Sequence, residues 1–133
     1  MITCDLHTHS TFSDGTFTPS QIVMEALRTN LSAVALTDHN TVAGLTEFLG
    51  AARGTALEAI SGVEISTGYL GKEVHIVGLF LEQEKYAKLT DFLDVINRRK
   101  EESNRALVAA LHTAGYELSY GEIRERHQGN VNR

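Results

Sequence analysis

The sequence predicts an α/β fold with parallel strands, because short apolar runs alternate with amphipathic segments. The runs at residues 2–6, 31–37 and 57–65 have the length of buried strands. Between them, residues 19–30 and 42–53 repeat apolar side chains at helical spacing. A strand, a helix and a second strand in this order form parallel strands joined by right-handed crossovers. The 133 residues, 42% of them apolar, suffice for one modest domain.

Both predicted helices carry boundary signals. Thr18 can cap the first helix, Pro19 suits its first turn, and Gln21 completes a capping box. Asn30 is a plausible stop for this helix, and Gly54 ends the second one. The alternation of strand and helix therefore has support from local sequence as well as from periodicity.

The chain beyond the third strand departs from this alternation. Residues 73–80 form a fourth apolar run, and the link that precedes it is too short for a crossover helix, so we expect a hairpin. A helical pattern then covers residues 86–114, and its charged stretch at residues 98–102 fits either one long helix or a break. A last short helix is expected at residues 120–127.

Potential metal ligands follow the ends of the predicted strands. His7 and His9 end the first strand, and side chains two residues apart in an extended chain point to the same side. The carboxyl ends of parallel strands meet at one rim, where α/β folds place their active sites. The hairpin should also bring Glu64 close to His75. The candidates at this rim are His7, His9, Asp14, His39, Glu64 and His75.

Each candidate has an ordinary structural explanation when it is taken alone: a surface histidine, a turn residue or a solvated carboxylate. Their convergence on one rim instead indicates a metal centre. Imidazole and carboxylate ligands without thiolate suit zinc, manganese or iron better than calcium, which prefers oxygen alone. The sequence has no Gly-rich phosphate loop and no nucleophile elbow, so a metal-activated water molecule is the natural nucleophile.

Composition excludes several other classes. A net charge of −5 argues against a large nucleic-acid-binding patch. The single cysteine, Cys4, excludes an internal disulfide and a cysteine-based zinc motif, and we expect it to be buried in the first strand. No signal peptide, membrane-spanning run or lipidation motif is visible, so no membrane association and a cytoplasmic location are expected. Arg98 and Arg99 can touch a nucleotide or RNA, although a solvated helix face is the favoured explanation.

Five short motifs together resemble a known family. They are DLHTHS at 5–10, SDG at 13–15, TDHN at 37–40, GVE at 62–64 and HIVG at 75–78. In this order they are similar to the opening motifs of the PHP (polymerase and histidinol phosphatase) family, over roughly the first 80 residues. The layout of the remainder is similar to the stand-alone phosphoesterases of that family, which include RNA and nucleotide hydrolases.

The resemblance implies the N-terminal half of a distorted (β/α)7 barrel, followed by a long helical segment. Residues 1–83 would form the barrel part with the ligand motifs, and residues 84–133 the helical segment. The implied activity is hydrolysis of a phosphoester substrate (a nucleotide, an oligoribonucleotide or a small phosphate ester) by a metal-activated hydroxide. The implied cofactors are divalent ions of zinc, manganese or iron, up to three in an intact domain.

The resemblance also implies a role for each motif residue. Carried over position by position, His7 and His9 would hold the first metal, Glu64 would bridge the first and second, His75 would bind the second, and Asp14 and His39 would bind the third. Asp5 and Asp38 lie next to ligands within the motifs, so they are expected to orient those ligands or to support the strand ends rather than to bind metal.

The later ligands of the family have no counterpart in this sequence. His112 and His127 match no family motif, and about four of the seven barrel strands can be found. We therefore expect a truncated chain with partial metal loading, little activity and open sheet edges that favour self-association. Two alternatives remain open: a catalytically incomplete module with a structural or partner-binding role, and an amidohydrolase-like metal enzyme, which would also begin with His-x-His.

Overall fold

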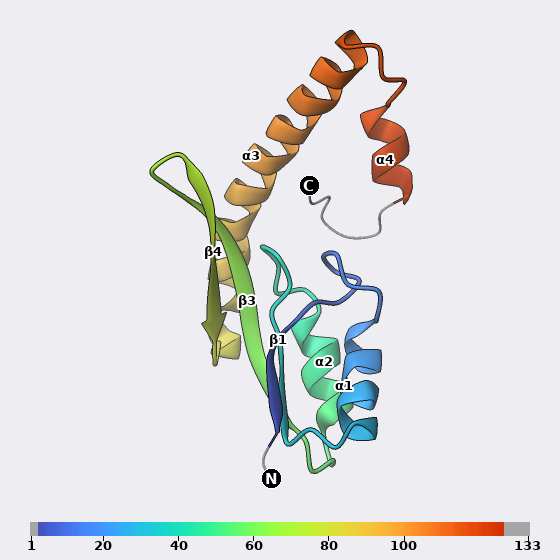
Figure 1. Ribbon diagram of the computed structural model, residues 1–133. Coiled ribbons are helices and arrows are strands. Elements are labelled where there is room, and N and C mark those ends of the chain that lie inside the picture. The colour runs from blue at the N-terminus through green and yellow to red at the C-terminus, as the bar shows by residue number, and fades with distance from the viewer. Residues whose placement is uncertain (1–2, 127–133) are drawn as a thin grey trace.

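The structure, a computed structural model, describes residues 3–126 as a curled sheet with helices packed against it (Figure 1). Its elements are β1 (Cys4–Thr8), α1 (Pro19–Arg28), β2 (Ala33–Leu36), α2 (Leu45–Ala52), β3 (Glu58–Tyr69), β4 (Lys72–Leu79), the short 3-10 helix η1 (Gln83–Lys85), α3 (Tyr86–Thr113) and α4 (Tyr120–Arg126). Within the described residues, no helix has both the length and the apolar character needed to cross a membrane.

The sheet has the order β1-β2-β3-β4 and is mixed in direction. β1, β2 and β3 run parallel, and β3 and β4 form the predicted antiparallel hairpin. β3 extends beyond the predicted end at residue 65, because its pairing with β4 continues to Tyr69 opposite Lys72. The predicted α/β fold class is therefore confirmed, as a half-barrel sheet.

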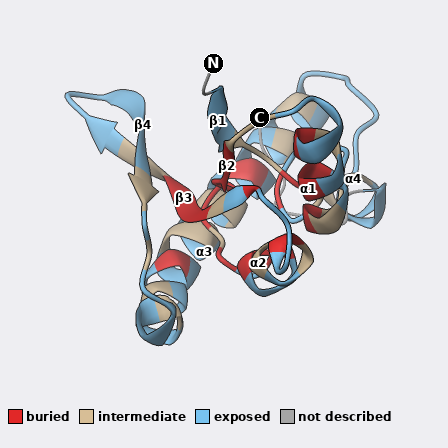
Figure 2. Cartoon of the chain, turned by 90° about the horizontal axis from the view of Figure 1, so that it is seen from below, coloured by how far each residue is buried: buried red, intermediate tan, exposed pale blue. Residues whose placement is uncertain are grey.

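The core lies between the sheet and the first two helices. Val34 and Leu36 of β2 pack with Val23 of α1 and Phe48 of α2, and all four side chains are buried. Figure 2 shows buried residues concentrated on β2, on the adjoining part of β3 and on the helix faces turned toward them. β2 is buried along its whole length, as the continuous apolar run predicted.

Local sequence sets the ends of α1 as predicted. The Gln21 amide donates to the Thr18 hydroxyl over 3.2 Å, and the Thr18 amide donates to the Gln21 side chain over 2.8 Å. Asn30 adopts a left-handed conformation with φ of 57° just beyond the helix. α2 instead begins three residues later than predicted, at Leu45, because residues before it form a turn in which the Thr41 hydroxyl accepts from the Ala43 amide.

β1 is an exposed edge strand, and the prediction that Cys4 is buried is wrong. The reason is topological, because among the described strands β1 has only β2 as a neighbour. β4 forms the opposite edge, and Leu6 on β1 and Ile76 on β4 are 39% and 55% exposed. Open edges were expected from the sequence, and self-association through them stays a prediction.

The long helix α3 continues through its charged middle without a break. Its first half packs on the core through Leu93, which is 1% exposed, whereas Leu107 in its second half is 44% exposed. The second half extends away from the sheet and reaches α4, where the Arg105 guanidinium lies 4.5 Å from the centre of the Tyr120 ring (Figure 1). α3 thereby passes beside the rim where the candidate ligands lie.

Candidate metal centre

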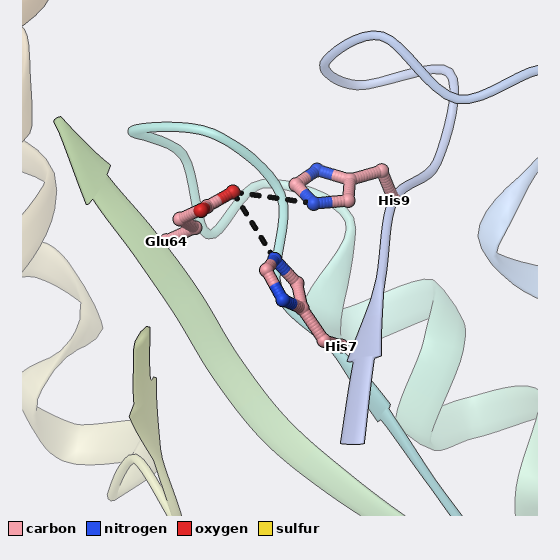
Figure 3. Close-up of side chains that lie close together, drawn as sticks. All are labelled: His7, His9 and Glu64. Carbon is pink, nitrogen blue, oxygen red and sulfur yellow. Dashed lines mark ion pairs between the residues drawn. The ribbon is translucent and has the colours of Figure 1, made fainter. Parts of the chain in front are cut away.

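Glu64 is the centre of the candidate site. This carboxylate lies near the middle of β3, and its side chain is 7% exposed. Its Oε2 atom is 3.2 Å from the Nε2 atoms of both His7 and His9. Figure 3 shows the two imidazoles pointing toward this carboxylate. The same Oε2 atom is 3.1 Å from Nδ1 of His39, and Oε1 is 3.2 Å from Nδ1 of His75. Four imidazoles from three separate segments, the end of β1, the loop after β2 and β4, therefore converge on one carboxylate.

Asp14 provides a second, more exposed carboxylate beside two of these rings. Its oxygens lie 3.4 Å from Nδ1 of His9 and 3.5 Å from Nε2 of His39. The centres of the two imidazole rings are 4.5 Å apart. His9 and His39 therefore each face Glu64 with one nitrogen and Asp14 with the other.

The structure brings all six predicted ligands together. Their ligand atoms form three groups, each with atoms within 4.8 Å of one another: His7, His9 and Glu64; His9, Asp14 and His39; and His39, Glu64 and His75. The groups share His9, His39 and Glu64, so three ions could not each have a separate ligand set. The assignment of individual ligands to individual metals stays a prediction.

A buried hydrogen-bond network fixes the loop after β1. Asp38, which is 2% exposed, accepts from the Ser10 amide over 2.7 Å and from the Ser10 hydroxyl over 2.6 Å. The Ser13 hydroxyl donates to Asp38 over 2.6 Å and lies 3.3 Å from Nδ1 of His9. Asp38 thereby holds Ser10 and Ser13 in place, and Ser13 in turn contacts the His9 ring. The orienting role of Asp38 stays a prediction.

The loop is also too tight for a side chain at Gly15. A Cβ atom there would lie 2.0 Å from the carbonyl oxygen of His9, so the chain can turn back on itself only with glycine. Asp5, the other predicted orienting residue, accepts from the His7 amide over 3.2 Å. This contact is with the backbone of His7, whereas the imidazole ring of His7 contacts Glu64.

An asparagine pair, which the sequence reasoning missed, connects α3 to this rim. The Asn40 side chain accepts from the Ser66 amide over 2.9 Å and donates to the Ser66 hydroxyl over 3.0 Å. The side-chain amide of Asn97 in α3 donates to the backbone carbonyl of Asn40 over 3.0 Å. Asn40 belongs to the TDHN motif, which was a usable signal, whereas nothing local marks Asn97.

A cavity of about 500 Å³ opens beside the ligands, between the β3–β4 hairpin and α3. Asp14, His39 and His75 line one part of it, and Arg99 and Lys100 line another. The favoured expectation for the Arg98–Arg99 pair was a solvated helix face. Arg99 is exposed but faces this cavity, whereas Arg98 lines a separate, smaller one.

The environment favours the protonation states that bind metals. Burial, the largest influence, lowers the pKa of the His39 imidazole, and the Glu64 and Asp14 carboxylates only partly oppose this. Burial alone would raise the pKa of the Glu64 carboxyl, but the hydrogen bond with His7 and the neighbouring histidine charges together lower it. A neutral imidazole and an ionised carboxylate are the forms that coordinate a cation.

The remaining histidines lie elsewhere. His112 is exposed in the last turn of α3 and belongs to none of the ligand groups found among residues 3–126. His127 lies outside the described residues.

Comparison with known proteins gives relatives that are named as enzymes acting on phosphoesters. A 5'-3' exoribonuclease of Haemophilus influenzae is 36% identical over 129 residues, which cover 97% of this chain and 47% of that protein. A 3',5'-nucleoside bisphosphate phosphatase of Chromobacterium violaceum is 36% identical over 86% of this chain and 40% of its own length. The chain thus spans about half the length, or less, of these curated relatives.

Two solved structures share the fold. An amidohydrolase of Chromobacterium violaceum, with bound sulfate and no metal, has a TM-score of 0.76 and 35% identity over 85% of this chain and 39% of that one. A candidate metal-dependent phosphoesterase of Bifidobacterium adolescentis has a TM-score of 0.79 at 23% identity, and covers 96% of this chain and 44% of that one. The second likeness, at its low identity, supports the fold alone.

The family model described as the PHP domain matches residues 5–128. That range contains the five motifs and every candidate ligand described above. The match extends over nearly the whole chain, and we conclude that this chain belongs to the PHP family, as its motifs indicated.

Proposed function

We propose that this chain carries the N-terminal portion of a divalent-metal centre that hydrolyses phosphoesters. The observation that carries the proposal is the convergence of His7, His9, His39 and His75 on the buried carboxylate of Glu64. The names of the curated relatives, an exoribonuclease and a nucleoside bisphosphate phosphatase among them, support phosphoester chemistry.

The donor set fits the proposed metals. Every group of ligand atoms combines imidazole nitrogen with carboxylate oxygen, which suits zinc, manganese or iron. Three protein ligands around one ion leave a position open, as in catalytic zinc sites. A bound divalent cation would supply a water molecule of lowered pKa and would stabilise negative charge on phosphoryl oxygens. His9 and His39 each belong to two groups, and a neutral imidazole binds only one ion, so we expect fewer than three ions in this chain alone.

The cavity beside the ligands supports a phosphorylated substrate. Arg99 and Lys100 line its α3 side, and Lys72 lines it from the hairpin. Guanidinium and ammonium groups hold phosphoryl oxygens through charge-assisted hydrogen bonds. We propose that these residues bind the substrate phosphate while the histidines and carboxylates bind the metal. A nucleotide or oligoribonucleotide is the proposed substrate class.

The first test is metal content, measured by plasma mass spectrometry after incubation with zinc or manganese and removal of free metal. His9 belongs to two of the three ligand groups, so His9→Ala should lose most of the bound metal. His112→Ala is the matched control, because it removes an exposed histidine outside the groups. Wild-type protein that retains no metal would refute the proposal.

Activity assays address the two alternatives. We expect slow, manganese-dependent hydrolysis of phosphodiesters or phosphomonoesters. Because a structural neighbour is named an amidohydrolase, the same preparations should be assayed on cyclic amides, and faster amide hydrolysis would overturn the proposed reaction. Bound metal with neither activity would support a catalytically incomplete module.

The cationic side of the cavity gives a separate prediction. Arg99→Ala and Lys100→Ala should each weaken binding of a nucleoside monophosphate to the metal-loaded chain by at least about tenfold, since a hydrogen bond to a charged group contributes about 1.5 to 3 kcal/mol. Isothermal titration calorimetry measures this change. Arg53→Ala, at the exposed end of α2, is the control for loss of one positive charge. Equal dissociation constants for all the variants would contradict the proposed phosphate contacts.

A further inference from the structure

His75 contacts a carboxylate on each side of its ring. Its Nδ1 atom lies 3.2 Å from Glu64 Oε1, which faces the other candidate ligands. Its Nε2 atom lies 3.2 Å from Oε1 of Glu73, a residue with no role in the motifs described above. The ring is therefore aligned with one nitrogen toward the candidate metal centre and the other toward Glu73.

The hairpin fixes this arrangement. Glu73 and His75 are two residues apart in β4, so their side chains leave the same face of the strand. β3 holds the strand in register, with Ser66 opposite His75 and Gly68 opposite Glu73. Both side chains therefore start from a backbone that is paired along its length, and a short contact between them requires no distortion of the strand.

The His75 ring is less buried than the His39 ring, so burial constrains its orientation less. The His39 side chain is 11% exposed, whereas that of His75 is 34% exposed. β4 is an edge of the described sheet, so packing from a further strand within residues 3–126 is absent. A partly exposed ring on an edge strand needs polar contacts to keep one orientation.

We infer that Glu73 is a positioning residue for His75. Glu73 accepts a hydrogen bond from Nε2–H, which fixes the tautomer that leaves Nδ1 free to bind a cation together with Glu64 and His39. A carboxylate behind a ligating histidine both orients the ring and raises its basicity, and removal of such a partner typically lowers metal affinity about 10- to 100-fold. The inference rests on the proposed metal centre.

The contact could instead reflect only the attraction of an exposed acid for a nearby ring. Glu73 lines the same cavity as Lys72 and Lys100, so its charge also affects the local potential. The two explanations differ for Glu73→Gln. Glutamine keeps a side-chain oxygen that can accept from Nε2–H but removes the negative charge, so a positioning role is partly retained and a purely electrostatic role is lost.

The test compares Glu73→Ala, Glu73→Gln and Glu58→Ala with the wild type. Glu58→Ala removes one exposed carboxylate at the start of β3, the end of the strand opposite the hairpin. Zinc affinity is measured by competition with a chelator. Long-range ¹⁵N–¹H NMR spectra of the zinc-loaded chain report which nitrogen of His75 carries the proton. Thermal unfolding followed by circular dichroism confirms that the variants fold.

For Glu73→Ala we expect at least a tenfold loss of zinc affinity. We also expect His75 to populate both tautomers instead of the Nε2–H form alone. Glu73→Gln should keep the Nε2–H tautomer and lose less affinity, and Glu58→Ala should match the wild type. Equal losses in the alanine and glutamine variants with an unchanged tautomer would overturn the inference, as would wild-type affinity in Glu73→Ala. Failure of the wild type to bind zinc would instead overturn the metal centre itself, and with it this inference.

Discussion

Replacing Glu64 by glutamine should strongly weaken metal binding while the chain stays folded. Glu64 is the carboxylate on which four imidazoles converge, and it belongs to two of the three ligand groups. The lowered pKa of its carboxyl means that the substitution removes a real negative charge at neutral pH. Glutamine preserves the shape of the side chain but gives a cation a neutral and weaker ligand. We expect zinc affinity to fall by at least about 100-fold. This loss is larger than that expected for a residue that only hydrogen-bonds to a metal ligand.

Chelator competition with zinc measures this loss, and plasma mass spectrometry checks the stoichiometry. Glu58→Gln is the matched control, because it makes the same chemical change at an exposed position of the same strand. Unfolding in urea shows whether the variant is intact. Wild-type zinc affinity in folded Glu64→Gln would exclude a metal centre organised around this residue, whichever ions occupy it.

Much of the candidate site could be predicted because its geometry follows from local pattern and simple topology. Parallel strands place their carboxyl ends at one rim, so His7, His9 and His39 had to lie close together once the strands were assigned. The side-chain contact of Glu64 with His75 followed from the short link between two apolar runs, which allowed only a hairpin. In each case the constraint acts over a short stretch of chain or through one sheet.

Residues supplied by α3 could not be predicted in this way. Arg99, Lys100 and Asn97 reach the rim because a helix of 28 residues packs against the core through its first half. The helical period gives the buried face of such a helix but not its position along the sheet or the angle at which it crosses. The charged stretch at residues 98–102 was therefore predicted to be a solvated helix face, although Arg99 and Lys100 line the cavity beside the ligands.

The exposure of β1 was missed for a related reason. An apolar run predicts a strand, but its burial depends on which neighbours pair with it, and those neighbours come from distant sequence. Cys4 is exposed because its strand is an edge of the sheet in residues 3–126. Glu73 escaped notice because a carboxylate on an exposed strand looks like ordinary surface charge until its contact with His75 is seen.

Asp38→Ala should be the most destabilising change near the site that removes none of the candidate ligands. The carboxylate is buried and accepts three hydrogen bonds, two from Ser10 and one from Ser13. Alanine would leave these donors without their acceptor, and each unsatisfied buried group costs about 1 to 3 kcal/mol. We expect the free energy of unfolding to fall by about 3 kcal/mol or more, as measured by urea denaturation followed by circular dichroism.

Asp38→Asn separates the loss of hydrogen bonds from the loss of charge. Its amide oxygen can still accept from the Ser10 amide and the Ser13 hydroxyl, which both bond to Oδ1, while its amide nitrogen can donate to the Ser10 hydroxyl in place of Oδ2. The cost should therefore be smaller, about 1 to 2 kcal/mol, because neutral hydrogen bonds replace charge-assisted ones. Asp91→Ala, at an exposed position of α3, should change stability by less than about 0.5 kcal/mol. If Asp38→Ala unfolds at the same urea concentration as Asp91→Ala, the network does not hold the loop, and the position of His9 must depend on something other than Ser13.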